Sequence, residues 1–320
     1  MQITFYILSS AVFVMCILPL IRKDHWTFRI FEFPRAQKWV LSLFLLVFGI
    51  FLYWRTNPNN WLLGFNAGLL AVLIHLSYLI WPYTPLGKKE VKRTKSKADI
   101  RFMVANVYQY NTQYQRLVKL VKKHRPNLLM LVETDKKWEK GITDIESDYP
   151  YKIKQVQDNT YGILIYSKIP IHQEQVRFLV EDDIPSVRCV LEINEKPVVL
   201  YSIHPEPPSP TENEYSTERD TELKLIAKEC AGQDEAIMVA GDLNDVAWSY
   251  TTTDFLKVSG LNDPRRGRGI FPTFHAANPI IRFPLDHIFI SDHFEITGIK
   301  RLPKFGSDHF PMFLGLKLKD

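Results

Sequence analysis

Apolar residues dominate three stretches near the start of the chain, at 3–21, 39–54 and 61–83, and none contains Asp, Glu, Lys or Arg. The first and third are close to the roughly 20 residues that a helix needs to cross a bilayer, and the second reaches that length only by extending into its flanks. Trp and Tyr at the ends of the second and third stretches suit the headgroup region. The pattern therefore predicts three transmembrane helices within residues 1–86, with buried core helices as the alternative.

From residue 99 onward the pattern changes to short β-like runs that alternate with helical ones. Helices are predicted at 112–124 and 216–231, and the Arg-, Gly- and Pro-rich segment 263–284 is predicted to be a loop. Because hairpin-like pairs of strands are interspersed with helices, the order predicts a mixed α/β (α+β) sandwich rather than a simple βαβ array. The predicted strands are 100–105, 128–132, 161–167, 187–193, 198–203, 236–240, 285–291 and 310–318.

Charge divides the chain at the same place. The whole chain has a net charge of +5, but residues 1–99 hold twelve basic and four acidic residues, whereas the rest hold 28 and 31. The soluble part therefore lacks the general basic footprint that nucleic-acid binding usually leaves. Three scattered cysteines form neither a disulfide framework nor a CxxC zinc site. We expect a membrane anchor at 1–86, a polybasic juxtamembrane linker at 87–98 and a soluble domain at 99–320.

The basic residues also predict a topology. Loop 22–38 carries five Lys or Arg, loop 55–60 carries one, and segment 88–97 carries six. The positive-inside rule places the first loop and the soluble domain in the cytoplasm, in a multi-pass protein whose partner is the lipid bilayer. The first stretch has no positive N-terminal region and no small-residue cleavage site, so it is predicted to be retained. Segment 88–97 either lies against anionic headgroups, at about 1 kcal/mol per charge, or is only a topology signal.

Side chains that bind metal ions or phosphate collect at the ends of the predicted strands. If neighbouring strands alternate in direction, these side chains converge on one rim. Mg²⁺ prefers oxygen ligands, and Glu133 and Asp308 can supply carboxylates. Hydrolysis of a phosphodiester also needs a positioned water and donors for the developing charge, which the remaining amides, carboxylates and imidazoles offer. The full set is Asn106, Glu133, His204, Asp242, Asn244, Asp286, Asp308 and His309.

The same positions carry a resemblance to a known family. The motifs are Asn106, Val132-Glu133, Tyr201-Ser202-Ile203-His204, Gly241-Asp242-Leu243-Asn244, Leu285-Asp286-His287-Ile288-Phe289 and Gly306-Ser307-Asp308-His309. In this order, over about residues 99–320, they resemble the endonuclease/exonuclease/phosphatase (DNase I-like) superfamily. The resemblance implies a four-layered α/β sandwich that hydrolyses phosphate esters. Membrane-anchored bacterial members have a similar layout, which implies the bacterial inner membrane.

The resemblance also implies roles for the residues near the metal ion and the attacking water. Glu133 would be the principal Mg²⁺ ligand, with Mn²⁺ as an alternative ion, and Asn106 and Asp308 would lie close to the metal. Asp242 and Asn244 would position or activate the water and contact the phosphate. Nothing in the sequence separates Asp242 from His309 as the general base.

Further roles are implied for the histidines. His309, oriented by Asp286, would be the second acid/base or phosphate-stabilising group, and His204 would stabilise the pentacovalent phosphate or assist the leaving group. Arg188 opens a strand, where it would either bind a substrate phosphate or form a surface ion pair. The arginines of segment 265–268 serve either phosphate binding or solubility.

These observations predict a membrane-anchored, Mg²⁺-dependent phosphoesterase, acting as a nuclease or as a phospholipid phosphodiesterase. The alternative is a non-catalytic, membrane-tethered binding module that retains the fold. Such a module would be free to lose metal ligands or acid/base groups. Every expected group is present, which favours the enzyme.

Overall fold

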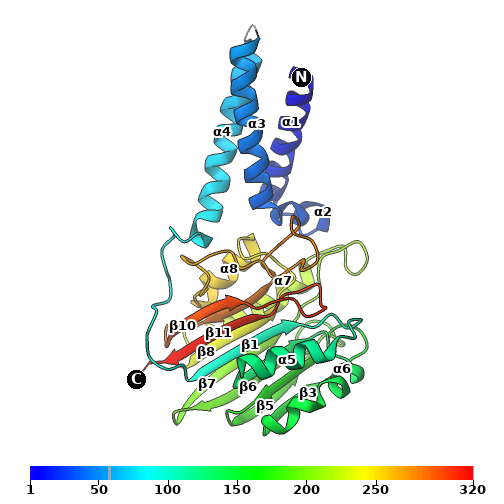
Figure 1. The fold of residues 1–320 in the computed structure, drawn as a ribbon, viewed down its shortest axis with the longest axis vertical. Coiled ribbons are helices and arrows are strands. Elements are labelled where there is room, and N and C mark those ends of the chain that lie inside the picture. Colours follow the sequence, from blue (N-terminus) through cyan, green and yellow to red (C-terminus); the bar gives the residue numbers. More distant parts are fainter. Residues whose placement is uncertain (57–58, 320) are drawn as a thin grey trace.

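The computed structural model describes residues 1–56 and 59–319. Three long helices stand together at one end of the molecule, with the sheets at the other (Figure 1). They are α1 (Gln2–Ile17), α3 (Arg35–Arg55) and α4 (Asn60–Ile80). With the short 3₁₀ turns that continue α1 and α4, the spans Gln2–Ile21, Arg35–Arg55 and Asn60–Tyr83 are long and apolar enough to cross a membrane. The second span reaches this length because its helix begins at Arg35 rather than at residue 39.

The rest of the chain is built around two mixed β-sheets, and apolar side chains fill the space between them. Helices α5 (Tyr114–His124) and α6 (Lys136–Gly141) cover one sheet, whereas α7 (Thr217–Cys230) and α8 (Tyr250–Ser259) cover the other. The layers therefore run helix, sheet, sheet, helix, which confirms the predicted α/β sandwich. The first sheet has the order β10 (Phe294–Arg301), β11 (Met312–Leu318), β1 (Ile100–Asn106), β2 (Leu128–Val132), β4 (Ile163–Ser167), β3 (Tyr151–Gln155). The second has the order β5 (Ile171–Arg177), β6 (Ser186–Ile193), β7 (Lys196–Ile203), β8 (Ala236–Asp242), β9 (Asp286–Ile290).

The direction of five strands determines where the polar side chains meet. Strand β1 runs parallel to β2, and β7 runs parallel to β8, so each pair ends at the same edge of its sheet. Strand β9 runs antiparallel to β8 and begins where β8 ends, with Asp286 paired to Asp242. The carboxyl ends of β1 and β8 and the start of β9 are thereby brought to one rim, as the sequence predicts.

The segment between α4 and β1 runs along the soluble part of the molecule. Figure 1 shows it in cyan, descending from the end of α4 past the sheets to the start of β1. Thr94 N donates to Ile296 O at 2.9 Å, Val91 is buried in the core between the sheets, and Glu90 pairs with Arg266 at 2.5 Å. For the later residues of segment 88–97 these contacts favour the topology signal over contact with lipid headgroups, because strand-like bonds to β10 hold them away from the helices.

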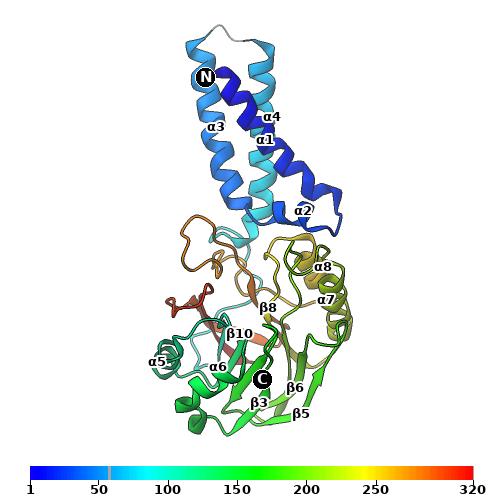
Figure 2. The same ribbon diagram turned by 90° about the vertical axis from the view of Figure 1, so that its right-hand side faces the viewer.

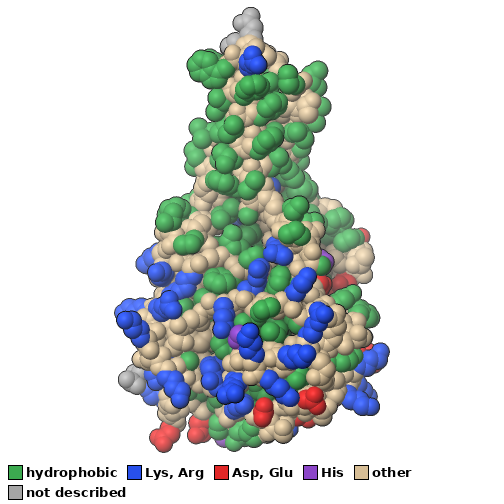
Figure 3. All heavy atoms as spheres, viewed as in Figure 1, with side chains coloured by type: hydrophobic (Ala, Val, Ile, Leu, Met, Phe, Trp, Pro, Cys, Tyr) green, Lys and Arg blue, Asp and Glu red, His purple; other side chains and the backbone are tan. Residues whose placement is uncertain are grey.

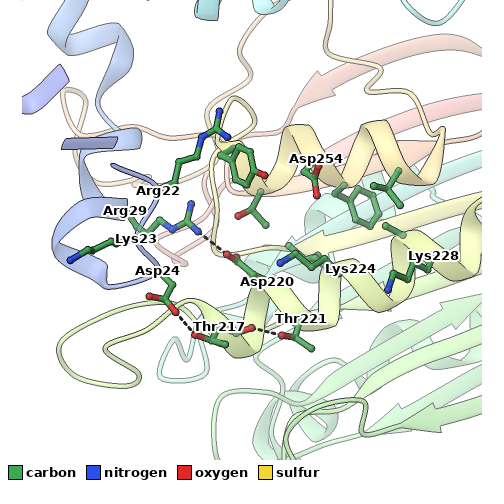
Figure 4. A pocket seen from close by; sticks show the side chains of 16 residues that line it. Arg22, Lys23, Asp24, Arg29, Thr217, Asp220, Thr221, Lys224, Lys228 and Asp254 are labelled. Atoms are coloured by element: carbon green, nitrogen blue, oxygen red, sulfur yellow. Dashed lines mark hydrogen bonds and ion pairs between the residues drawn. The ribbon is translucent and has the colours of Figure 1, made fainter. Parts of the chain in front are cut away.

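The loop between α1 and α3 packs onto the soluble part through α2 (Trp26–Arg29) and the 3₁₀ turn after it. Arg29 Nη2 lies 2.9 Å from Asp220 Oδ2 on α7, and Figure 4 shows this pair beside the bond from Thr217 to Asp24. Trp248 Nε1 donates to Glu32 O at 2.9 Å, and both residues are buried. The helices and the sandwich are therefore joined by buried polar contacts.

Candidate active site

Glycine and an unusual backbone conformation shape the rim where the polar residues meet. Gly241, with φ 152°, lies so close to the carbonyl of Ile203 that a Cβ would overlap it, so β7 and β8 can bring His204 and Asp242 together only with glycine here. Glu133 and Asn244 have φ of 60° and 49°, which non-glycine residues adopt rarely and at some cost in free energy. Such backbone is found most often at functional sites.

Asn106 joins two carboxylates across the two sheets. Its Nδ2 donates to Glu133 Oε1 at 2.6 Å and to Asp242 Oδ2 at 3.0 Å, while its Oδ1 accepts from Tyr108 N. Gln109 N donates to the other oxygen of Glu133 at 3.3 Å. The amide of Asn106 therefore fixes the relative positions of Glu133 and Asp242.

His309 lies between two carboxylate oxygens, one of which is the Asp242 oxygen that Asn106 contacts. Its Nδ1 is 2.8 Å from Asp286 Oδ2, and its Nε2 is 3.4 Å from Asp242 Oδ2. Asp286 is oriented from behind by Thr273, whose Oγ1 accepts from the backbone N–H of Asp286 at 3.1 Å. The ring of Phe274 packs against the imidazole with centroids 5.1 Å apart. The arrangement orients the imidazole with one nitrogen toward Asp286 and the other toward Asp242.

His204 and Asn244 form the third part of the cluster. Asn244 N donates to Asp242 Oδ1 at 3.0 Å, and its side-chain nitrogen lies 3.4 Å from His204 Nε2. The ring of Tyr161 packs on His204, and His204 Nδ1 has no hydrogen-bond partner among the residues that the structure describes. His204 is thus a buried imidazole that can still make one polar contact.

Burial and neighbouring charges set different protonation states within this cluster. Burial lowers the pKa of His204 to about 4, so it is neutral at pH 7. Burial alone would also lower the pKa of His309, but Asp286 and Asp242 outweigh it and raise the pKa to about 10. Burial would raise the pKa of Asp242, yet His309 and His204 bring it below its ordinary value. At neutral pH the cluster therefore pairs an ionised Asp242 with a protonated His309.

Glu133 is a buried carboxylate whose negative charge a bound cation would stabilise. Burial raises its pKa to about 7, more than the bond from Asn106 and the charge of His309 offset, and Asp242 and Asp308 raise it further. Oxygen-rich sites with surplus negative charge suit a divalent cation such as Mg²⁺, so the residues present fit the metal ion that the sequence predicts. Asp242, Asp286 and His309 also lie close enough to hold an ion. However, a protonated imidazole is not a metal ligand, so Glu133 is the better position.

Two of the predicted phosphate-binding groups lie outside the cluster. Arg188 is half-buried with its guanidinium over the ring of Tyr201, 5.9 Å from the centroid, on the face of the sheet that α7 covers. Arg265 is buried in an ion pair with Asp263 at 2.7 Å. The structure brings together the other predicted residues. Arg188 lies away from them, whereas Arg265 reaches only the backbone of the cluster, where it donates to Asp286 O at 3.2 Å.

Two supporting residues were not predicted as part of the site. Ser307 Oγ donates to the backbone oxygen of Asn106 at 2.9 Å and accepts from His309 N at 2.9 Å, linking two sides of the site. Arg219 is fully buried and donates to the backbone oxygen of Asn244 at 2.9 Å. Ser307 could have been recognised from its place in the Gly306–His309 motif, whereas Arg219 lies in a polar helix that gives no indication of burial.

Comparison with solved structures identifies the same architecture in other proteins. The matches include D. rerio TDP2 complexed with a single-strand DNA product (13% identity, TM-score 0.58, covering 68% of this chain and 98% of that chain). An endonuclease/exonuclease/phosphatase family protein from Bacteroides thetaiotaomicron matches at 14% identity and a TM-score of 0.57, over 69% and 98% of the two chains. These likenesses show the fold. No curated protein matches the sequence.

A family model provides the assignment by sequence. It describes the Endonuclease/Exonuclease/phosphatase family and matches residues 103–309. The matched range contains Asn106 near its start and His309 at its end, and it includes every other residue of the cluster. Together with the fold, this match shows that the chain belongs to the endonuclease/exonuclease/phosphatase family.

Proposed function

We propose that the protein is a metal-dependent phosphoesterase that hydrolyses phosphodiesters by in-line attack of water. The observation that carries the proposal is the joined cluster in which Asn106 links Glu133 to Asp242 and His309 lies between Asp242 and Asp286. Membership of a family whose name covers nucleases and phosphatases supports the same reaction class.

Each side chain has a task that follows from its protonation state. The ionised Asp242, held by the backbone of Asn244 and the amide of Asn106, accepts a hydrogen bond from the attacking water and then its proton. His309 carries a proton at neutral pH and stabilises the negative charge that develops on the phosphate. The neutral His204 and the amide of Asn244 orient the non-bridging oxygens.

A divalent metal ion, Mg²⁺ or Mn²⁺, would be held by Glu133 with Asp308 and Asn106 near it, and when bound it polarises the phosphate oxygens. In the structure Asn106 Oδ1 already accepts a hydrogen bond from Tyr108 N. Its amide therefore serves first to position Glu133, and the carboxylate of Glu133 is the principal donor for the ion.

The three apolar helices support a place in a membrane, and we propose a multi-pass protein of the bacterial inner membrane with its catalytic domain in the cytoplasm. The proposal follows the charge of the loops. We further propose the boundaries 1–86 for the anchor, 87–98 for the linker and 99–320 for the catalytic domain. A reporter that is active only outside the cytoplasm, fused after the last residue, should be inactive; an active reporter would contradict this orientation.

Two substrate classes fit the molecule. The net charge of the soluble part hides an uneven distribution, because Lys and Arg gather on the face below the helices while few Asp or Glu are found there (Figure 3). Lys119, Lys122 and Lys123 of α5 are exposed. The net charge of the soluble part therefore underestimates how basic this face is. This face supports a nucleic acid as the substrate, and the anchor supports a phospholipid.

The test is hydrolysis by the full chain in detergent micelles of DNA, RNA, glycerophospholipids and sphingomyelin, with Mg²⁺, with Mn²⁺ and with chelator. We expect metal-dependent hydrolysis of at least one substrate, and Asp242→Asn should lower its rate by about 10²–10⁴-fold. The exposed Asp182 provides a control, because Asp182→Asn makes the same chemical change away from the cluster. An Asp242→Asn variant with the wild-type rate would refute the proposal. Metal binding that depends on Glu133 without any turnover would indicate the binding module instead.

A further inference from the structure

A large groove lies at the soluble end of α3, outside the catalytic cluster. It has a volume of about 1140 Å³ and runs between α3 and the loop 270–282. The helix contributes Val40 and Phe44, and the loop contributes Phe271 and Ile280. Val40, Phe44 and Ile280 are 62%, 65% and 74% exposed, so this wall of the groove is apolar and uncovered.

The other end of the groove is cationic. Arg282, Lys300 and Arg301 line it, and no Asp or Glu is among the lining residues. The guanidinium carbons of Arg282 and Arg301 lie 5.1 and 4.2 Å from the ring centroid of Phe310, so two positive charges share one ring. Within residues 1–56 and 59–319, neither arginine forms an ion pair.

The hydrogen bonds of these arginines do not neutralise them. Arg282 Nε donates to Asn278 O at 3.0 Å, and Arg301 Nη1 donates to Pro272 O at 2.7 Å. Burial and the charge of Arg282 both lower the pKa of Arg301. Two neighbouring cations without a counter-charge repel each other, and an anion bound between them would remove that repulsion.

The position of the groove indicates which kind of anion it would bind. Its apolar wall continues along α3, a helix long and apolar enough to cross a membrane, so that wall faces the bilayer. Figure 2 shows the loop 270–282, in orange, at the base of α3. Gln37 Nε2 of α3 donates to Ile280 O at 2.8 Å, which holds the exposed Ile280 and Ile281 beside the helix. A nucleic acid would match the cationic end alone, whereas an amphiphile matches both ends.

We propose that this groove binds an anionic phospholipid of the adjoining leaflet, with an acyl chain along Val40 and Phe44 and the phosphate between Arg282 and Arg301. Lys300, which is exposed over the ring of Phe313, adds a third positive charge to the phosphate. The site is separate from the proposed reaction and does not depend on it.

The lipid would restrain a segment that packs against the catalytic cluster. The loop that forms one wall of the groove also places the ring of Phe274 on His309, and Ala276 N donates to Asp308 O at 2.6 Å. A ligand that binds the folded protein raises its unfolding temperature in proportion to the binding free energy. Lipid binding should therefore appear as thermal stabilisation of the full chain.

The test measures binding to the full chain in an uncharged detergent. Phosphatidylglycerol and phosphatidylcholine are titrated separately, and bound lipid is followed by native mass spectrometry together with the unfolding temperature. We expect phosphatidylglycerol to bind more tightly and to raise the unfolding temperature. Since a charge near a lipid phosphate contributes about fivefold in affinity, Arg282→Gln/Arg301→Gln should weaken phosphatidylglycerol binding by about 25-fold.

Two further variants keep the result interpretable. Lys300→Gln, at an exposed position, should weaken binding by about fivefold without affecting folding. Lys119→Gln/Lys122→Gln on the exposed face of α5 removes two charges away from the groove and should leave binding unchanged. The proposal is overturned if the groove variants keep wild-type affinity, if the α5 variant loses as much affinity as they do, or if the wild type does not distinguish the two lipids.

Discussion

Arg219 offers the sharpest test of how the loop that carries Asn244 is held in place. Only 1% of it is exposed. Its guanidinium donates to Asp220 Oδ1 at 2.9 and 3.1 Å and to Asn244 O at 2.9 Å, and it lies 3.7 Å from Asp245 Oδ2. Arg219→Met keeps most of the side-chain volume but leaves Asp245 buried without its guanidinium partner. Asp220 retains Arg29, which limits the loss at that carboxylate.

The magnitude follows from the burial of the charges. Removing one partner of a buried ion pair costs about 3–5 kcal/mol. In a domain of about 200 residues each kcal/mol shifts the unfolding temperature by roughly 2–4 °C, so we expect a fall of about 6–20 °C. The assay is thermal unfolding of the full chain in detergent, followed by tryptophan fluorescence.

The exposed Arg116 provides the matched control for this experiment. Surface substitutions usually change stability by no more than about 0.5 kcal/mol, so Arg116→Met should unfold within about 2 °C of the wild type. Equal shifts for the two variants would show that the buried network does not stabilise the loop, and the reasoning would be wrong.

The remaining predictions concern the site and one buried carboxylate. Asp286→Asn removes the charge that orients and protonates His309, so hydrolysis at pH 7 should fall by about 10²–10⁴-fold in a rate assay; an unchanged rate would exclude that role. Glu133→Gln should abolish Mg²⁺ binding measured by calorimetry, whereas Asp182→Asn should not, and retained binding would place the ion elsewhere. Burial raises the pKa of Glu222 from 4.5 to about 7, although the charge of Arg177 lowers it. Between pH 4.5 and pH 7 the folded chain therefore binds more protons than the unfolded chain, and the stability of the fold falls as the pH rises. Glu222→Gln removes this titration and should flatten the fall in unfolding temperature across that window; a fall as steep as in the wild type would contradict it.

Apart from β9, the strands that the sequence predicts have neighbours on both sides; β9 is an edge strand that is buried along its whole length. Strands β2 and β4 are buried along their whole length, so their residues form continuous apolar runs that are easy to recognise. The missed strands β3, β5 and β10 are all edges of their sheets. In β5 five of seven residues are exposed, and its sequence IHQEQVR shows no alternation of apolar and polar residues. An edge strand is paired on one side only, so its pattern carries less information.

The chemistry of the site could be predicted because it depends on residues next to strands, whereas partners distant in sequence could not. Arg266 illustrates the difference. The arginines of segment 265–268 were predicted to serve either phosphate binding or solubility, but the structure pairs Arg266 with Glu90. Glu90 is more than 170 residues away from Arg266. Periodicity along the chain cannot reveal such a pair.

The same limitation applies to the predicted boundary between the membrane anchor and the catalytic domain. Composition divides the chain near residue 99, yet contacts cross that boundary and continue to the site: Arg29 pairs with Asp220, Asp220 pairs with Arg219, and Arg219 donates to the backbone of Asn244. A chain beginning at residue 99 would keep every residue of the cluster. It would nevertheless lose the ion pair between Arg29 and Asp220. It would also lose the backbone carbonyl of Glu32, which accepts a hydrogen bond from the buried Trp248. Because Asp220 would then hold Arg219 without the support of Arg29, the loop that carries Asn244 should be less well ordered in such a chain.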